Sequence, residues 1–352
     1  MQNLSHDESI GRQSFRSISM PQSVKSILVP PAFPASAATS IKEIAQTAGV
    51  EMKCIFLPAD PDARLEVAAL EGIQAAFFGS QIPQGYGRSF FSAVRKAPNL
   101  KWLHLFNVGV DHPIFAEMLQ KGVRLTTSAG TTAVPIARTA LAGLLMLSRG
   151  FPRWMDAQRR KDWAPIRAEE APPDLDGQTL CILGLGGIGS ELARLALGLG
   201  MHVVGIRRSP RRGEDPVDEL FPPQMLKEVL STSQWLAITC PLTDETRGLI
   251  DREAIKKLPK GAAIINVGRG EIIDEGALIE AVETQHLLGA YLDVFHNEPL
   301  PTSSRLWELP NVILSPHNSA ISKGNESRIL ELLFDNLGHW LRDEALVNEV
   351  TA

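Results

Sequence analysis

Three glycines at the spacing Gly184-x-Gly186-x-x-Gly189 are the residues whose pattern points most directly to chemistry. An apolar run, 179–183, precedes them, and an amphipathic segment, 191–197, follows. In a strand, turn and helix of this kind, the glycines make a tight turn, admit a pyrophosphate to backbone amides at the helix N-terminus, and let helix and strand pack closely. We therefore predict a dinucleotide site whose turn residues are Gly184, Gly186, Gly187, Ile188 and Gly189. A purely structural glycine turn is the alternative.

The next apolar run, 202–206, ends in Arg207-Arg208-Ser209, where no carboxylate is present. A unit that binds NAD usually holds the adenine ribose hydroxyl with an acidic residue about 20 positions after the turn. Two guanidinium groups would instead clamp a 2'-phosphate, which an acid would repel. We predict that Arg207 and Arg208 favour NADP(H), with NAD(H) possible. In the alternative, both are turn residues and Glu214 or Asp215 folds back.

Length and composition limit what kind of protein surrounds this motif. The chain has 352 residues, enough for two globular domains, and 44% of them are hydrophobic and 21% charged, as in ordinary α/β proteins. A formal net charge of -5 gives no support to a nucleic-acid partner. The basic cluster Arg207, Arg208, Arg211 and Arg212 therefore needs a local explanation.

Cysteine usage and the longest apolar run bear on the cellular location. Cys54, Cys181 and Cys240 are far apart and odd in number, so we expect no disulfide framework and a reducing, cytoplasmic setting. The run 139–147 is far shorter than the roughly 20 residues of a membrane span. Residues 1–24 are rich in serine and lack apolar periodicity, so we expect a disordered tail; a transit peptide is the alternative.

Short apolar runs alternate with longer amphipathic segments from residue 26 onward. The first series of predicted strands is 27–29, 53–57, 75–79 and 102–106. The second series begins near Leu125 and includes a helix over 134–148, strands over 179–183, 202–206, 235–239, 262–266, 289–294 and 311–314, and a last helix over 325–341. This rhythm predicts an α/β protein with two doubly wound parallel-sheet domains.

Five further segments occur in order along the chain: Asn107-Val108-Gly109-Val110-Asp111-His112, Cys240-Pro241-Leu242-Thr243, Asn266-Val267-Gly268-Arg269-Gly270, Asp293-Val294-Phe295-His296-Asn297-Glu298-Pro299, and 309–317, which ends in Ser315-Pro316-His317. With these segments and the glycine turn, the chain resembles the D-isomer-specific 2-hydroxyacid dehydrogenases from about residue 25 onward. The similarity is greatest to their glyoxylate and hydroxypyruvate reductase branch.

The resemblance implies a catalytic set of Arg269, Glu298 and His317. A 2-oxo acid needs a permanent cation for its carboxylate and carbonyl oxygen, and arginine does not deprotonate. It also needs a proton donor, and a histidine oriented by a carboxylate suits this task. All three residues follow predicted strands, at the edge where open α/β sheets bind ligands. Taken singly, each has a structural explanation as a loop residue, and His296 is a rival acid by its spacing from Glu298.

The resemblance also implies the remaining ligand contacts. Backbone amides of Val108 and Gly109, together with Arg269 and His317, would bind the substrate. Asp293 would take the nicotinamide carboxamide, and further cofactor contacts would come from Cys240, Pro241, Thr243, Thr246, Val267 and Gly268. No metal ligand is expected.

The implied architecture is a Rossmann-type cofactor domain, residues 125–318, inserted into a smaller flavodoxin-like substrate domain, residues 25–124 and 319–352. A homodimer is expected from the family alone. The sequence departs from the family pattern at Arg138, where an acid is usual, at Asn107, where a small residue is common, and at Asn318-Ser319-Ala320, where a glycine-containing turn is common. These departures bear on the shape of the substrate pocket.

The leading hypothesis is an oxidoreductase that reduces a small 2-oxo acid, glyoxylate or hydroxypyruvate first, to the D-2-hydroxy acid with NAD(P)H. A formate or phosphite dehydrogenase of the same superfamily is a second candidate. A dinucleotide-sensing binding protein, like the transcriptional corepressors that share the fold, is a third. Arg207 and Arg208 count against that third candidate, because such proteins normally favour NAD(H).

Overall fold

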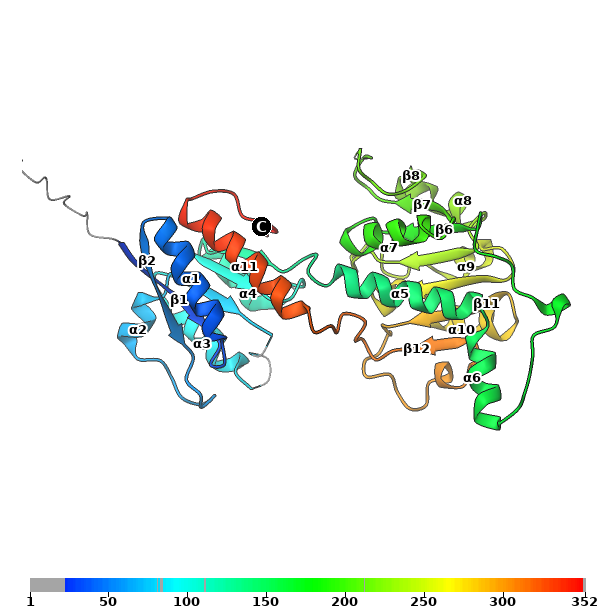
Figure 1. Ribbon diagram of the computed structural model, residues 1–352, viewed down its shortest axis with the longest axis horizontal. Coiled ribbons are helices and arrows are strands. Elements are labelled where there is room, and N and C mark those ends of the chain that lie inside the picture. Colours follow the sequence, from blue (N-terminus) through cyan, green and yellow to red (C-terminus); the bar gives the residue numbers. More distant parts are fainter. Residues whose placement is uncertain (1–22, 81, 83–84, 111, 212, 351–352) are drawn as a thin grey trace, which may run out of the picture. The chain divides into compact units, whose positions relative to one another are not determined.

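The computed structural model describes residues 23–80, 82, 85–110, 112–211 and 213–350. It divides into two compact units, one made of the described residues up to Ser128 and from Ile329 onward, and the other running from Ala129 to Arg328. The predicted tail lies outside the described residues except for Ser23 and Val24, which begin the first strand. Each unit is built on a parallel sheet, as the sequence predicts (Figure 1).

The first unit holds a five-stranded sheet in the order β2-β1-β3-β4-β5, and every pairing is parallel. This order is that of flavodoxin-like folds. The strands are β1 (Ser23–Val29), β2 (Val50–Phe56), β3 (Ala75–Phe78), β4 (Trp102–Leu105) and β5 (Arg124–Thr127). The helices are α1 (Ala35–Thr47), α2 (Val67–Gly72), α3 (Gly87–Lys96), α4 (Pro113–Gln120) and the greater part of α11 (Asn325–Leu341). Apolar residues of α1 and α11 cover one face of the sheet, and those of α3 and α4 cover the other.

The second unit holds a seven-stranded parallel sheet in the order β12-β11-β10-β9-β6-β7-β8. Its strands are β6 (Thr179–Leu183), β7 (His202–Ile206), β8 (Glu219–Phe221), β9 (Trp235–Ile238), β10 (Ala262–Asn266), β11 (Leu287–Leu292) and β12 (Val312–Leu314). Its helices are α5 (Ala133–Ser148), α6 (Phe151–Arg160), α7 (Gly187–Leu197), α8 (Leu226–Leu230), α9 (Arg252–Lys257) and α10 (Glu275–Glu283), with 3-10 turns η1 (Ala168–Glu170), η2 (Pro223–Met225), η3 (Gly270–Ile272) and η4 (Arg305–Trp307).

Two apolar layers enclose this second sheet. Helices α8, α9 and α10 pack on one face, and α5 and α7 pack on the other (Figure 1). Because all pairings are parallel, the carboxyl ends of β6, β7, β9, β10, β11 and β12 meet at one edge. The strand order reverses at β6: the chain continues to β7 and β8 on one side of it and then returns to β9 on the other side. Ligands of doubly wound sheets bind at such a reversal of strand order.

Strand β5 corrects the predicted start of the second series and of the cofactor domain at residue 125. This strand pairs with β4 in the first sheet, with Trp102 opposite Arg124 and Leu105 opposite Thr127. The buried indole of Trp102 also donates to Thr126 Oγ1 at 2.9 Å. The chain therefore leaves the first unit only after Ser128.

The return to the first unit also comes later than the predicted residue 319. Residues 319–328 stay with the second unit because polar contacts hold them there. Ser319 Oγ donates to Asp293, Asn325 Nδ2 donates to the carbonyl oxygen of Ala320, and Arg328 Nε donates to that of Thr131. Only from Ile329 onward does α11 belong to the first unit.

Several strand assignments also differ. Strand β1 begins at Ser23 instead of the predicted Ile27, and β2 begins at Val50 instead of the predicted Lys53. Strand β11 begins at Leu287, before the predicted Gly289, and ends at Leu292. The side chain of the next residue, Asp293, binds the loop after β12. The short edge strand β8 was not predicted. Among the described residues, none of the helices has the length and apolar character needed to cross a membrane.

Candidate active site

The glycine turn joins β6 to α7 at the reversal of the sheet. Gly184 has φ +101°, and a Cβ there would lie 2.6 Å from the backbone nitrogen of Cys240, at the end of the neighbouring strand. A Cβ at Gly189 would lie 2.3 Å from the carbonyl oxygen of Gly184. Backbone approach alone therefore requires glycine at both positions.

The start of α7 has the features that a pyrophosphate needs. The helix begins at Gly187, earlier than the predicted Glu191, so the turn itself forms its first residues. The N-cap residue Gly186 supplies no side-chain hydrogen bond, and a Cβ there would meet nothing within 4 Å. Backbone N–H groups at a helix start with open space beside them attract anions. The turn therefore fits a dinucleotide.

Arg207, at the carboxyl end of β7, is bound to an acidic residue within its own loop. Its guanidinium donates to Asp215 Oδ1 at 2.9 Å and to Asp215 Oδ2 at 2.6 Å, and it also donates to the carbonyl oxygen of Pro210 at 2.7 Å. The two side chains are only 14% and 7% exposed. Asp215 thus folds back, as the alternative interpretation of this segment allowed, and Arg207 stabilises the loop.

Arg208 is the exposed arginine of the pair. Among the residues that the structure describes, nothing forms a hydrogen bond or an ion pair with its side chain. The pKa of Glu245 is lowered mainly by a hydrogen bond from Thr243 and, more weakly, by the charge of Arg208. Arg208 therefore lies near the loop after β9, which contains the residues predicted to contact the adenosine end of a dinucleotide.

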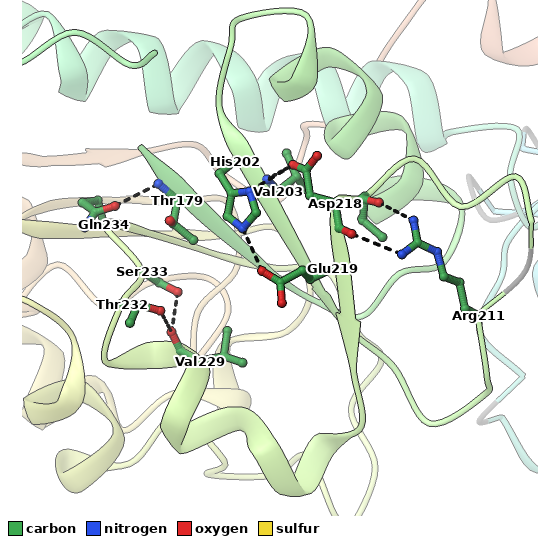
Figure 2. A network of polar contacts seen from close by, with 11 residues as sticks. Thr179, His202, Val203, Arg211, Asp218, Glu219, Val229, Thr232, Ser233 and Gln234 are labelled. Carbon is green, nitrogen blue, oxygen red and sulfur yellow. Dashed lines mark hydrogen bonds and ion pairs between the residues drawn. The ribbon is translucent and has the colours of Figure 1, made fainter. Parts of the chain in front are cut away.

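Further polar contacts hold the loop that carries these arginines (Figure 2). Arg211 donates to the carbonyl oxygens of Val217 and Asp218, at 2.7 and 3.2 Å. The carboxylate of Asp218 accepts from Val203 N at 2.8 Å and lies 3.3 Å from His202 Nδ1, so the loop is attached to the start of β7 (Figure 2). Arg211 therefore has a local structural task, which accounts for its place in the basic cluster; Arg212 lies outside the described residues.

The loop after β9 contains four predicted cofactor residues. Cys240 is buried, and burial raises the pKa of its thiol to about 11. Thr246 closes the loop, because its hydroxyl accepts from Thr243 N at 2.7 Å and donates to the carbonyl oxygen of Pro241 at 2.8 Å. Thr246 thus shapes the turn that presents Pro241 and Thr243.

Arg269 follows β10 in a turn that only glycines permit. A Cβ at Gly270 would lie 2.0 Å from the backbone carbon of Phe295, and one at Gly268 would lie 2.8 Å from the carbonyl oxygen of Cys240. The buried side chain of Asn266 fixes the turn, because its Oδ1 accepts from Gly268 N and its Nδ2 donates to the carbonyl oxygen of Arg269, both at 3.0 Å.

The guanidinium of Arg269 is exposed, and its one recorded bond goes to the carbonyl oxygen of Gly268 at 2.7 Å. Within the described parts of the chain, it has no carboxylate partner. It is therefore a cation available to an anionic ligand.

Glu298 and His317 meet at the same edge of the sheet. His317 Nδ1 lies 2.7 Å from Glu298 Oε2, and Glu298 Oε1 accepts from Phe295 N at 3.0 Å. Because an ionised carboxylate only accepts, Nδ1 carries a proton and Nε2 is the ring nitrogen left for a ligand. The two side chains are 48% and 35% exposed, so the pair is accessible. The rival His296 has no carboxylate on its ring among the described residues; its backbone N–H donates to Glu275.

The backbone of His317 is in the left-handed region, with φ +51°. Its N–H donates to the carbonyl oxygen of Asp293 at 2.8 Å, which holds this conformation. A residue other than glycine with positive φ is uncommon, and such residues cluster at functional sites.

Asp293, predicted to contact the nicotinamide, uses its carboxylate within the protein. It is 2% exposed, and both oxygens accept hydrogen bonds from the loop that carries His317. Ser315 and Ser319, which supply two of these bonds, were missed by sequence reasoning. Their positions two residues before and after His317 were the available signal.

Val108 and Gly109 lie in the first unit, in the loop after β4, where Val108 is 53% exposed. Asn107 supports this loop, because its side-chain Nδ2 donates to the carbonyl oxygen of Gly109 at 2.5 Å. The backbone carbonyl oxygen of Asn107 accepts from Ser128 N at 3.3 Å. Asn107 Oδ1 is buried without a partner among the described residues. In this loop Val108 is thus exposed, and the hydrogen bonds of Asn107 support the backbone beside it.

A buried histidine lies at the base of this loop. His104 Nδ1 is 2.7 Å from Thr126 Oγ1, and His104 Nε2 is 3.2 Å from Ser128 Oγ. Ser128 Oγ donates its single proton to the carbonyl oxygen of Leu105 at 2.8 Å, so it accepts from His104 Nε2–H. In the neutral ring Nδ1 then accepts from the Thr126 hydroxyl. Burial lowers the pKa of His104 to about 3.

The cofactor turn, Arg208, Arg269, Glu298 and His317 thus follow strands of one sheet, at one edge. Comparison with known proteins bears on what this arrangement does. Residues 141–319 match the family model described as D-isomer specific 2-hydroxyacid dehydrogenase, NAD binding domain. A glyoxylate reductase of Korarchaeum cryptofilum is 33% identical over 264 residues, which cover 72% of this chain and 77% of that protein.

The chain belongs to the D-isomer specific 2-hydroxyacid dehydrogenase family. It is an NAD(P)-dependent oxidoreductase of that family. The glyoxylate/hydroxypyruvate reductase B of Serratia proteamaculans is 32% identical over 298 residues, covering 80% of this chain and 91% of that protein. A family member from Xanthobacter autotrophicus Py2, solved with NADPH and MES, is 28% identical with a TM-score of 0.71, covering 94% of this chain and 98% of that one. The family assignment and the two-domain fold expected from the sequence are thereby confirmed.

Proposed function

We propose that this dehydrogenase reduces glyoxylate, hydroxypyruvate or a similar small 2-oxo acid to the D-2-hydroxy acid, with NADPH as the preferred reductant. The observation that carries the proposal is the accessible Glu298–His317 pair, which lies at the edge of the sheet that bears the dinucleotide turn. Arg269 follows a strand at the same edge and has no carboxylate partner among the described residues. The names of the relatives from Korarchaeum cryptofilum and Serratia proteamaculans support this substrate class.

Arg269 is the substrate cation in this proposal. Its exposed guanidinium binds the carboxylate and carbonyl oxygen of the oxo acid, which polarises the carbonyl group towards attack at C2. Asn266 and the two flanking glycines fix the turn, so the charge is preorganised. Backbone amides of Val108 and Gly109 are proposed as further ligands of the carboxylate.

His317 is the proton donor. As C2 is reduced, negative charge develops on the carbonyl oxygen, and the proton on His317 Nε2 moves to it. Glu298 accepts from Nδ1 throughout, which keeps the ring oriented and stabilises its charged form. When bound at the glycine turn, the reduced dinucleotide supplies the hydride for C2.

The cofactor preference rests on Arg208 and on the support that Arg207 gives its loop. Arg208 is exposed and unpaired among the described residues, whereas Arg207 is neutralised by Asp215. We therefore assign the 2'-phosphate contact mainly to Arg208, with Arg207 as the residue that shapes the loop. The NADPH recorded with the Xanthobacter autotrophicus relative supports this preference.

The test is consumption of NADPH by the purified protein on a panel of glyoxylate, hydroxypyruvate, pyruvate and a bulky aromatic 2-oxo acid, with formate and phosphite tested as substrates for NADP⁺ reduction. We expect turnover with the small 2-oxo acids. Turnover with formate or phosphite alone would move the protein to another activity of the superfamily. A dinucleotide-dependent protein partner recovered by pull-down, together with negligible turnover, would favour a sensor.

We further propose a homodimer formed through the second unit. Helix α6 and the segment after it expose four large apolar side chains, Phe151, Trp154, Met155 and Trp163, with Trp163 93% exposed. The rings of Phe151 and Trp154 are adjacent, with centroids 5.1 Å apart, and contiguous exposed apolar side chains mark association sites. Light scattering should give twice the monomer mass, and a Trp154→Glu variant should weaken the dimer.

A cytoplasmic location is proposed on the basis of the cysteines. Cys54, Cys181 and Cys240 are all free, and burial raises the pKa of each thiol. Free, protonated thiols suit a reducing compartment. Cell fractionation tests this location.

A further inference from the structure

Two serines clamp the carboxylate beneath the loop that carries His317. Ser315 Oγ donates to Asp293 Oδ1 at 2.6 Å, and Ser319 Oγ donates to Asp293 Oδ2. The backbone N–H groups of Asn318 and Ser319 donate to Oδ1 at 3.0 and 3.1 Å. Both sides of His317 are thus attached to one buried group, and this attachment fixes the left-handed turn at His317 itself.

Tyr291, on β11, extends this network away from the ligand edge. Its hydroxyl lies 2.6 Å from Ser315 Oγ. Because Ser315 donates its single proton to the Asp293 carboxylate, Tyr291 must be the donor in this contact. Burial raises the pKa of Tyr291, and the charge of Asp293 raises it further, so the phenol keeps its proton. Hydrogen bonds that run in one direction along a chain polarise and strengthen one another.

Helix α5 sets the place of the Tyr291 ring. A Cβ at Gly143 would lie 2.4 Å from Tyr291 Cγ, so only glycine leaves room for the ring against the helix. One helical turn earlier, Thr139 Oγ1 lies 3.4 Å from the carbonyl oxygen of Ser319. The same face of α5 therefore supports both the tyrosine and the loop that it reaches through Ser315.

We propose that Tyr291 is a positioning residue for His317, acting through Ser315 and Asp293. Its phenol holds Ser315 in the orientation that anchors Asp293, and Asp293 then holds the turn from which His317 meets Glu298. The proposal rests on the proposed role of His317 as proton donor. In this proposal Asp293 anchors the loop that carries His317, and both of its carboxylate oxygens accept hydrogen bonds from that loop.

The test compares Tyr291→Phe with Tyr86→Phe in the full-length enzyme. The chain has two tyrosines, and the Tyr86 hydroxyl also makes one hydrogen bond, to the carbonyl oxygen of Ala59 at 2.8 Å, in the first unit. Tyr291→Phe removes the donor and leaves the ring in place. We expect kcat with NADPH and glyoxylate to fall about 5-fold, with KM for NADPH and the melting temperature nearly unchanged. Tyr86→Phe should change neither kcat nor KM.

A second readout separates this proposal from the proposed function. Hydrogen exchange of the Asn318 and Ser319 amides reports the loop without any substrate, and we expect it to be about 5-fold faster in Tyr291→Phe than in the wild type or Tyr86→Phe. Ser315→Ala should speed exchange as Tyr291→Phe does, and the Tyr291→Phe/Ser315→Ala double variant should exchange no faster than Ser315→Ala alone. Ser315→Thr keeps the hydroxyl, so its exchange should be as slow as in the wild type. Unchanged exchange in Tyr291→Phe, or additive losses in the double variant, would overturn the relay, whatever substrate the wild-type enzyme turns over.

Discussion

His317 Nδ1 lies 2.7 Å from Glu298 Oε2, and this contact joins the loops that follow the neighbouring strands β11 and β12. The other oxygen of Glu298 accepts from Phe295 N within its own loop. One carboxylate oxygen of Glu298 is therefore bound to the backbone of its own loop and the other to the imidazole of His317. The orientation of His317, the proposed proton donor, therefore depends on the carboxylate of Glu298.

Replacing Glu298 by glutamine tests that dependence. Glu298→Gln keeps the shape of the side chain but removes the charge that supports a protonated His317, so we expect kcat with glyoxylate to fall by about 10-fold or more. Steady-state kinetics of the purified variant measure the effect. Glu308→Gln, at an exposed site, serves as the control, and equal activity of both variants would remove Glu298 from the mechanism.

Arg269 should be sensitive even to a change that keeps its charge. A lysine presents a single ammonium group where arginine presents a planar fork, so Arg269→Lys should lower kcat/KM for glyoxylate about 100-fold. The dissociation constant for NADPH, measured by fluorescence titration, should stay close to the wild-type value. Arg305→Lys is the control, because that exposed arginine pairs with Glu283 away from the proposed substrate. A large loss of NADPH affinity would instead assign Arg269 to the cofactor.

The two arginines after β7 should behave differently when changed. Arg208→Gln removes an exposed, unpaired charge, so KM for NADPH should rise about 10-fold with KM for NADH unchanged. Arg207→Gln leaves the nearly buried Asp215 without its partner, so the melting temperature should fall by several degrees. Kinetics with both cofactors and thermal unfolding of both variants separate the roles. An Arg208→Gln variant that keeps the wild-type KM for NADPH would contradict the role of Arg208 in binding the 2'-phosphate. An Arg207→Gln variant as stable as the wild type would contradict the structural role of Arg207.

His104 should make the stability of the first unit depend on pH. Burial lowers its pKa in the folded state to about 3, below its ordinary value near 6.5, so the unfolded chain takes up the proton first. The neutral histidine therefore contributes stability above pH 6.5, and this contribution is lost as pH falls from 6.5 towards 3. Between pH 7 and pH 5 the wild type should lose about 2 kcal/mol more unfolding free energy than His104→Gln. Urea unfolding at both pH values measures this difference, and equal losses would contradict a neutral His104.

Strand bounds were predicted best where a motif of the candidate site directly follows a buried strand. The runs 179–183, 202–206 and 262–266 are strands with the predicted bounds, because each is a buried apolar segment with a polar or glycine boundary. Strand β8 escaped prediction, since its residues are exposed or half-buried and its pairing with β7 depends on the folded loop before it.

Loop contacts show where sequence reasoning ends. The sequence around Arg207, Glu214 and Asp215 allowed either a phosphate clamp or a turn in which an acid folds back. The ion pair between Arg207 and Asp215 appears only in the folded loop. Ser315 and Ser319 read as ordinary loop residues until β11 brings Asp293 beneath them. Likewise, β5 belongs to the first sheet because of its pairing with β4, a contact that no local pattern records.

The most direct test of the central claim is the rate of NADPH oxidation with glyoxylate in the wild type and in His317→Gln. The wild type should turn over, and the variant should lose about 100-fold or more in kcat while binding NADPH with unchanged affinity. A wild-type protein without turnover on any small 2-oxo acid, or a His317→Gln variant that keeps wild-type kcat, would contradict the account.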